Sequence, residues 1–223
     1  MGMKSIFKVV NFEFPYNRFK FPGQAKDEKI LYVTRESKAL LYLRLMMVVL
    51  VSLTLFMAGF ILPDLLEMFG GVVVNWVRLG VFGLSVVFLV VGGWWIYSLW
   101  RKSIFILTNR RLTKFIYTTP WNRYNLSLSL DRVVDTGSYA RGYFQALLGV
   151  GTFTARSSAG NRQEKYFYIE NVHQFEDLAN YVNKVLFVYT RDVDKLDSFR
   201  PFLPWLKGEA RNRYMQDYPE FWS

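Results

Sequence analysis

Two long apolar blocks constrain this chain more than any other feature. Residues 45–62 (LMMVVLVSLTLFMAGFIL) and residues 79–100 contain no charged side chain. As α-helices rising about 1.5 Å per residue, both blocks approach or exceed the roughly 30 Å thickness of a hydrocarbon core. A buried helical hairpin is the alternative, but two uncharged runs of this length favour membrane spans. We therefore expect a transmembrane hairpin over residues 39–102, with helices at about 40–62 and 77–100.

Flanking cations predict the orientation of this hairpin. Lysine and arginine cluster before the first block and after the second, whereas residues 63–78 carry Arg78 as their one cation. By the positive-inside rule, both termini are then cytoplasmic and the short connection lies outside. This predicts a multi-pass protein of the cytoplasmic (inner) membrane. The cations concerned are Lys26, Lys29, Arg35, Lys38 and Arg44 before the first helix, and Arg101, Lys102, Arg110, Arg111 and Lys114 after the second.

Small residues recur along the second apolar block, namely Gly80, Gly83, Ser85, Gly92 and Gly93. Small side chains let helix backbones approach closely, so we expect them to pack against the first helix of the hairpin. Association with a second copy of the chain is the alternative. The absence of ionisable side chains inside both blocks argues against an ion pathway through the bilayer.

The composition excludes most familiar catalytic chemistry. The chain has no cysteine, a single histidine (His173) and a net charge of +10. Thiolate metal sites, disulfides and cysteine nucleophiles are therefore excluded, as are multi-histidine metal sites. Neither a phosphate-binding P-loop nor a GxSxG nucleophile elbow occurs, and the carboxylates lack metal-ligand spacing. We predict a non-enzymatic protein without cofactor or metal, in which His173 is a solvent-exposed residue.

After the second apolar block, short β-like runs alternate with turn signals. Asn109-Arg110 is typical of a tight turn, and residues 141–148 predict a short helix or turn. An amphipathic helix over 172–188 follows, with Asn171 as its N-cap. Such a pattern predicts an antiparallel β-barrel or sandwich over 103–189, capped by that helix. The predicted strands are 103–108, 111–118, 124–130, 132–139, 149–156 and 165–170.

Both ends of the chain are rich in aromatic residues. We expect a cytoplasmic N-terminal segment over 1–38 and a C-terminal tail over 190–223. A disordered tail seldom carries so many aromatic side chains. They therefore either pack on the tail's own domain or form a docking motif for another protein. The candidate docking residues are Phe199, Phe202, Trp205, Tyr218 and Trp222.

Four stretches carry a resemblance to a known family: FILTNRRL, LSLSLDRVVDT, LLGVGTFTARSSAG and FYIENVHQFEDLANYV, preceded by FPGQAKDEKILYVTRES. Over roughly residues 21–188, the chain resembles the bacterial pleckstrin-homology-like domain family, in its membrane-anchored branch with two helices ahead of the domain. Where many relatives carry a histidine just before the first helix, this chain has Ser37 and Lys38. The resemblance implies a membrane-anchored PH-like domain with a C-terminal helix, but it implies no ligand.

Basic residues near the second apolar block form a candidate anionic-lipid site. The resemblance places Arg110 and Arg111 near the first strand–strand loop, where eukaryotic relatives of the fold bind phosphorylated inositol lipids. Each lysine or arginine near an anionic surface contributes about 1 kcal/mol of binding. A role as a topology signal alone is the alternative. The candidates are Arg101, Lys102, Arg110, Arg111 and Lys114.

Three functions fit these features. The first is a non-enzymatic scaffold that binds an unidentified protein at the cytoplasmic face of the membrane. The second is a sensor of anionic lipid, using Arg110, Arg111 and Lys114. The third is an accessory subunit of a transporter or envelope enzyme, acting through the hairpin. Nucleic acid is not expected as a partner, because no RNA-binding signature is present and the aromatic residues mostly occupy strand positions.

Overall fold

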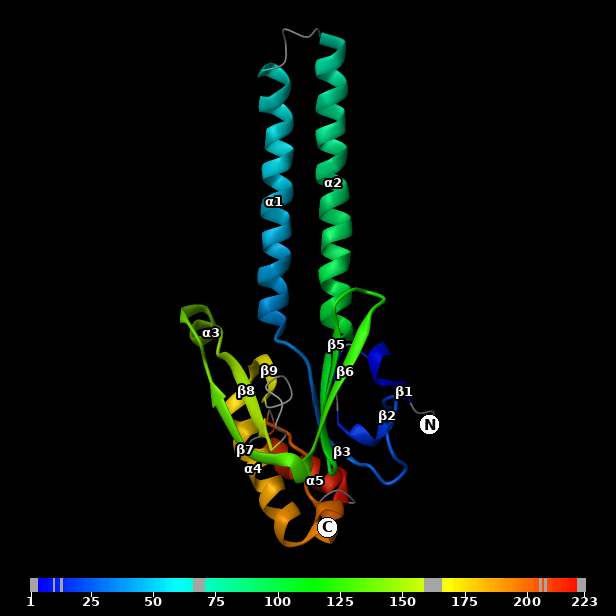
Figure 1. Cartoon of the computed structure of the whole chain (residues 1–223), viewed down its shortest axis with the longest axis vertical. Coiled ribbons are helices and arrows are strands. Elements are labelled where there is room, and N and C mark those ends of the chain that lie inside the picture. The colour runs from blue at the N-terminus through cyan, green and yellow to red at the C-terminus, as the bar shows by residue number, and fades with distance from the viewer. Residues whose placement is uncertain are drawn as a thin grey trace. The chain divides into compact units, whose positions relative to one another are not determined.

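The computed structural model describes residues 4–9, 11–12, 14–65, 71–158, 166–204, 206 and 208–219. The chain divides into two compact units. One is a helical hairpin formed by residues 38–100, and the other combines residues 1–37 with residues 101–223. We call the second unit the two-sheet domain (Figure 1).

The hairpin consists of α1 (Lys38–Leu65) and α2 (Gly71–Lys102). Both are long and apolar enough to cross a membrane, and few of their side chains are buried. Serine and glycine bring the helices together: the Ser52 hydroxyl donates to the Ser85 carbonyl at 2.9 Å, and the Phe82 ring occupies space that a Cβ on Gly59 would need. The expected packing of small residues against the first helix is thus observed at Ser85 and at Gly92, where a Cβ would lie 3.2 Å from Val48, whereas a Cβ at Gly80, Gly83 or Gly93 would meet nothing within 4 Å. Gly59, on the first helix, was not anticipated.

The first sheet of the two-sheet domain is antiparallel, with strand order β3-β4-β5-β6. Its strands are β3 (Ile30–Thr34), β4 (Ile104–Thr108), β5 (Arg111–Tyr117) and β6 (Arg123–Ser129). Because β3 precedes α1 and β4 follows α2, the helices form the connection between two neighbouring strands. The domain therefore extends beyond the expected 103–189, since one edge strand comes from the segment assigned to the N-terminal region.

The second sheet contains three antiparallel strands, β7 (Val133–Tyr139), β8 (Val150–Ser157) and β9 (Tyr166–His173). A one-turn 3₁₀ helix, η4 (Leu130–Arg132), joins it to the first sheet, and α3 (Tyr143–Leu147) lies between β7 and β8. The amphipathic helix is α4 (Phe175–Arg191), which packs on β7 and β8. These are the antiparallel sheets and C-terminal helix that the resemblance implies.

The start of α4 differs from the expected position. Strand β9 continues to His173, because Val172 is buried and pairs with Gly151. Asn171, expected as the N-cap, instead lies within the strand in a left-handed conformation (φ 57°). Gln174 occupies the N-cap position, and the helix ends at Arg191 rather than near residue 188.

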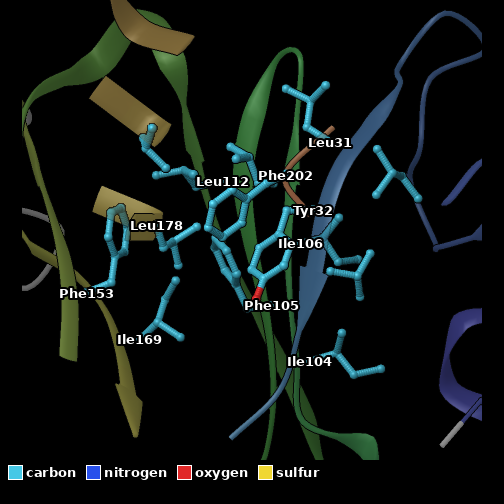
Figure 2. Packing of buried hydrophobic residues seen from close by; sticks show 14 of the residues in the cluster. Leu31, Tyr32, Ile104, Phe105, Ile106, Leu112, Phe153, Ile169, Leu178 and Phe202 are labelled. Carbon is cyan, nitrogen blue, oxygen red and sulfur yellow. The ribbon is translucent and has the colours of Figure 1, made fainter. Parts of the chain in front are cut away.

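A hydrophobic core lies between the two sheets and α4. The Phe105 ring on β4 lies 6.4 Å from the Phe153 ring on β8 and 6.0 Å from the Phe167 ring on β9. Figure 2 shows Phe153, Ile169 and Leu178 on one side of this core, facing Phe105 and Leu112 of the first sheet. Neighbouring strand residues point to opposite faces, so Ile104 and Ile106 turn away from this core.

Those outward side chains are buried as well, because the N-terminal segment covers the outer face of the first sheet. This segment contains β1 (Lys4–Ser5), η1 (Ile6–Lys8), η2 (Tyr16–Arg18) and β2 (Phe19–Lys20). Phe7 and Phe21 place their rings 5.2 and 6.1 Å from the ring of Phe115 on β5. Every residue of β4 is therefore buried, which explains its continuous apolar sequence.

The C-terminal tail also packs on the domain. It contains η5 (Val193–Ser198) and α5 (Gly208–Asp217). The Phe202 amide donates to the Leu31 carbonyl of β3 at 2.9 Å, and the Tyr218 ring lies 5.2 Å from Phe14 of the N-terminal segment. The described part of the tail thus belongs to the folded unit.

Candidate functional site

The four-stranded sheet has two ends that differ in what is attached to them. At one end, which we call the attachment end, Thr34 pairs with Phe105 and the chain continues into α1 and α2. At the other, the distal end, Asn109 and Arg110 form the turn between β4 and β5. The five candidate lipid-binding cations are divided between these ends and the middle of the sheet.

Arg110 and Arg111 lie at the distal end, and both are paired with acidic residues of the N-terminal segment. Arg110 forms an exposed ion pair with Asp27. Arg111 binds Glu28 in a bidentate manner, with Nε 2.9 Å from Oε1 and Nη2 2.9 Å from Oε2. The Glu28 side chain is only 1% exposed. The guanidinium of Arg111 is thus already occupied by a buried carboxylate.

The surroundings of Glu28 stabilise its charged form. Burial opposes ionisation, but hydrogen bonds from the Arg111 guanidinium, the Ala25 amide and the Thr108 hydroxyl outweigh burial, and the pKa of Glu28 is lowered. The amide and hydroxyl bonds measure 3.0 and 2.8 Å. The hydrogen bond to Glu28 in turn raises the pKa of Arg111. This geometry is that of an internal tie, which holds residues 25–28 against the β4–β5 turn.

Asn109 extends this tie to both ends of the chain. Its Oδ1 accepts from the Lys29 amide at 3.0 Å, and its Nδ2 donates to Asp197 Oδ1 at 3.0 Å. The N-terminal segment and η5 therefore meet at the β4–β5 turn. The sequence predicted this turn but gave no sign of the residues that hold it.

Lys114 lies between the two ends, facing the inside of the domain. It pairs with Phe105 in the β4–β5 register, and its Nζ donates to the Tyr168 carbonyl at 3.1 Å. Burial lowers the pKa of Lys114, against opposing contributions from Glu170 and Glu36. Its ammonium group is thus directed to a backbone carbonyl of the other sheet rather than to an exposed basic surface.

Arg101 and Lys102 lie at the attachment end, where α2 finishes. Lys102 Nζ donates to the Pro120 carbonyl at 2.7 Å and lies 5.4 Å from the centre of the Tyr117 ring. Arg101 is half-buried. The five candidate cations therefore do not form one surface.

The resemblance also placed Arg110 and Arg111 one connection too early. Because β3 is the first strand of the sheet, its connection to β4 is the helical hairpin itself. The Asn109–Arg110 turn joins the second and third strands. Arg110 and Arg111 therefore lie in a different connection from the one to which the resemblance assigned them.

A cavity of about 720 Å³ opens beside the distal turn, between β6 and β9. We call it the basic cavity. Arg132 joins Arg110 and Arg111 in its lining, and Glu28 and Asp131 offset part of their charge. Ser127, Ser129, Ser157 and Asn125 add hydroxyl and amide groups. Such a lining is suited to a small polar ligand that carries negative charge.

The candidate docking residues of the tail lie in or against the core where the structure describes them. The Phe202 ring is buried, 4.8 Å from Tyr32 and 4.9 Å from Tyr181. Phe199 is half-buried, 5.6 Å from Tyr181. Tyr218 packs on Phe14 as described above. Trp205 and Trp222 lie outside the described residues.

Where the tail crosses α4, it borders a groove of about 840 Å³, which we call the tail groove. Helix α4 contributes Tyr181, Lys184 and Val188, and the tail contributes Phe199 and Leu203. Lys195 and Arg200 add basic groups and Asp177 an acidic one. The lining therefore combines apolar side chains with charged groups of both signs.

A further cluster, absent from the sequence analysis, gathers at the attachment end. Ser37 Oγ lies 2.7 Å from His173 Nε2, and the Ser37 amide donates to the Asn171 carbonyl at 2.8 Å. Asn171 Nδ2 donates to Glu36 Oε1, and Asn171 Oδ1 accepts from Gln145 Nε2, both at 2.9 Å. We call this cluster the polar clasp. It ties the residues just before α1 to β9 and to the β7–β8 connection.

The polar clasp has only part of a nucleophile–base arrangement. Ser37 and His173 are within hydrogen-bond distance, but the Ser37 side chain is buried. The other ring nitrogen of His173 lies 3.3 Å from the Gly149 carbonyl rather than from a carboxylate. A triad would place an orienting acid there. Among the described residues, no group of three histidine, cysteine or acidic side chains could hold a metal ion.

Comparisons with known proteins add one fold similarity. No protein-family model and no curated protein matches the chain. A solved structure of a DUF1696 family protein with a pleckstrin-homology domain, from Shewanella loihica PV-4, is similar over 40% of this chain and 71% of that chain. The two share 15% sequence identity, with a TM-score of 0.29. The agreement with the fold that the sequence resemblance implies rests on the two antiparallel sheets and the following helix of this chain, and not on this structural similarity.

Proposed function

We propose that this chain is a non-enzymatic interaction module, anchored in the cytoplasmic membrane by α1 and α2, whose two-sheet domain binds a partner protein on the cytoplasmic side. The observation that carries the proposal is the pairing of β3 with β4 across the inserted hairpin. Anchor and domain therefore cannot be separate modules joined by a linker.

The helices support the membrane part of the proposal. The two apolar stretches, Lys38–Ile61 and Val74–Lys102, contain 24 and 29 residues. At about 1.5 Å per residue both exceed a hydrocarbon core of roughly 30 Å. Their apolar side chains are largely exposed around the helix, as on Leu53 and Leu84. In water such a surface is unfavourable, whereas in lipid it is solvated.

Strand pairing supports the expected topology. Residues on both sides of the hairpin belong to one folded unit, so both outer ends of the helices lie on the same side of any membrane that they cross. The cations before α1 and after α2 favour the cytoplasmic side.

The tail groove is the surface that we assign to the partner. It combines apolar side chains with Lys184 and Lys195, and exposed Val193 begins η5 two residues before Lys195. The candidate docking residues Phe199 and Phe202 both line this groove, although most of the Phe202 side chain is buried. The missing catalytic motifs of the sequence are in keeping with a binding role.

The test combines topology and crosslinking in the full chain. The chain has no cysteine, so single-cysteine variants report accessibility without background. In intact cells, a cysteine in place of exposed Val193 should not react with a membrane-impermeant reagent. It should react once the membrane has been permeabilised and the reagent reaches the cytoplasmic side. A photo-crosslinking residue at position 184 should trap one specific protein, whereas the same residue at position 131 should not. Labelling from outside would refute the orientation, and identical products at both positions would refute the groove.

The basic cavity favours a second candidate, an anionic-lipid or phosphate sensor. Of the cations that line it, Arg132 is exposed, whereas Arg110 is paired with Asp27 and Arg111 with Glu28. This candidate requires Arg132→Glu to weaken binding of the full chain in nanodiscs to inorganic phosphate or to phosphorylated headgroups. Unchanged binding would leave the tail groove as the functional surface.

A further inference from the structure

Two loops of the two-sheet domain lie at its attachment end. The first, residues 118–122, joins β5 to β6. Because Ile104 pairs with Phe115, this hairpin continues two residues beyond the start of β4, or about 7 Å at 3.3 Å per residue. The hydrogen bond from Lys102 Nζ to the Pro120 carbonyl, 2.7 Å long, holds the loop beside the last residue of α2.

The second loop, residues 140–149, joins β7 to β8 and contains α3. The polar clasp holds it: Gln145 binds Asn171, whose backbone carbonyl accepts from the Ser37 amide. Ser37 immediately precedes α1. Each loop is thus hydrogen-bonded, directly or through one residue, to the domain residue that borders one apolar helix.

The exposed side chains of both loops share an unusual composition. Trp121 is 77% exposed in the first loop, and Tyr143 and Leu147 are 76% and 66% exposed in the second. Arg123 and Arg141 are exposed beside them. Neither residues 118–124 nor residues 139–149 include an acidic residue. The acidic residues Asp27, Asp131 and Asp197 belong to the elements at the distal end, whereas Glu36, in the polar clasp at the attachment end, is half-buried and accepts from Asn171.

This combination matches one environment, the interfacial layer of a phospholipid bilayer. Tryptophan and tyrosine favour the membrane–water interface because they join an apolar ring to a polar group. Arginine adds attraction to anionic headgroups, whereas nearby carboxylates would be repelled. In water, by contrast, exposing large apolar surface on a tryptophan, a tyrosine and a leucine is unfavourable.

We infer that loops 118–122 and 140–149 are a pair of membrane-contact loops, which place Trp121, Tyr143 and Leu147 in the headgroup layer of the bilayer that holds α1 and α2. The inference rests on the proposed membrane anchoring and adds a third and a fourth point of contact. It assigns this role to residues other than the five candidate cations. The first turn of α4, which follows the polar clasp, carries exposed Glu176 and Asp177, and neither residue belongs to the two loops.

Depth-dependent quenching tests the inference in the full chain, reconstituted in vesicles that contain brominated phospholipid. A fluorophore is attached to one cysteine at a time: Trp121→Cys and Tyr143→Cys in the loops, Asp131→Cys at the distal end and Leu84→Cys in α2. All four positions are exposed in the structure. We expect bromolipid to reduce the fluorescence of labels at 121, 143 and 84, and to leave the label at 131 unchanged.

The controls separate this inference from the proposed function. Quenching at 84 without quenching at 121 and 143 would overturn the membrane-contact loops and leave the anchor intact. No quenching at 84 would overturn the anchor, and the inference with it. If Trp121→Cys does not fold, Asn122→Cys reports on the same exposed loop. Repeating the measurement with zwitterionic and with anionic vesicles, each at low and at high salt, shows whether the arginines contribute. Only the attraction between arginine and anionic lipid should weaken as the salt concentration rises.

Discussion

Ser37 and His173 are 136 residues apart in the sequence, yet Ser37 Oγ lies 2.7 Å from His173 Nε2. The hydrogen bond joins the residue before α1 to the last residue of β9. Together with the bond from the Ser37 amide to Asn171, it fixes the point where the chain leaves the two-sheet domain for the first long helix.

Replacing Ser37 with alanine should loosen this point without unfolding the domain. One hydrogen bond of this kind contributes about 1 kcal/mol. We expect faster amide hydrogen exchange in peptides that cover residues 30–37 and 170–174, and unchanged exchange in β5 and β6. His173→Asn keeps a hydrogen-bonding group, so the amides of these peptides should be less protected from exchange than in the wild type but more protected than in His173→Ala. Uniformly faster exchange would show that the clasp is instead essential to the whole fold.

The Glu28–Arg111 pair should contribute far more stability than its neighbour. Removing one partner of a buried ion pair leaves the other without compensation, so Glu28→Ala should destabilise the domain by about 3 kcal/mol. Asp27→Ala, which breaks the exposed pair with Arg110, is the matched control and should change stability by at most about 1 kcal/mol. Urea denaturation of the detergent-solubilised chain, followed by near-ultraviolet circular dichroism, measures both. Equal effects would contradict the burial-based explanation.

Glu28 also predicts a pH dependence. Its pKa is lower in the folded state, so its contribution to stability is complete above the ordinary carboxyl value of about 4.3. That contribution is lost as the pH falls through the lowered folded value. The unfolding free energy of the wild type should therefore decrease more steeply below about pH 4.3 than that of Glu28→Gln. Parallel pH profiles would show that Glu28 does not gain stability from its charge.

Phe202 should behave as a core residue. Its ring is buried between Tyr32 and Tyr181, and truncation of a buried phenylalanine costs about 3–5 kcal/mol. Phe202→Ala should lower the unfolding midpoint more than Phe199→Ala, whose ring is only half-buried. A near-neutral Phe202→Ala would indicate that the tail separates readily from the domain. If Phe202 is a core residue, deleting residues 197–223 unfolds the domain, and a loss of partner binding would then have two causes. Point substitutions in the tail groove are preferable.

The domain should fold without its hairpin, provided that both flanking segments are kept. Joining residues 1–37 to residues 101–223 through about ten glycine and serine residues restores a simple β3–β4 connection. We expect a soluble protein with dispersed amide resonances. A fragment of residues 102–223 lacks the edge strand and the aromatic cover of Phe115, and it should be unstable or aggregate. A well-folded 102–223 fragment would contradict the assignment of β3 to the sheet.

The sequence predicted the elements that depend on local pattern. The length of two uncharged apolar runs identified both long helices, and the predicted strand 124–130 corresponds to β6, where Leu128 is buried and Leu126 half-buried. The Asn109–Arg110 turn was also predicted correctly. Strand β3 was missed because ILYVT precedes the first apolar block and was assigned to the N-terminal segment. Its partner strand lies some seventy residues away, and no local signal indicates such a pairing.

The candidate site was less predictable for the same reason. The sequence shows that several arginines lie close together, but it does not show which carboxylates pair with them in the folded chain. Glu28 and Asp27 lie about eighty residues before Arg111 and Arg110. Asn171 was expected as an N-cap from residue type alone, but buried Val172 keeps the chain in β9 and moves the helix start to Phe175. Side-chain environment, rather than propensity, decided both.

The position of β3 ahead of the helices determines when the sheet can form during synthesis. Residues 30–34 leave the ribosome first, but their hydrogen-bonding partner emerges only after both helices have been made. If the hairpin inserts into a bilayer, a chain in which only one helix crosses leaves β3 and β4 in different compartments, and their ladder cannot assemble. The domain can thus fold only in chains whose two helices have both inserted, and chains with one inserted helix remain unfolded and exposed to proteolysis.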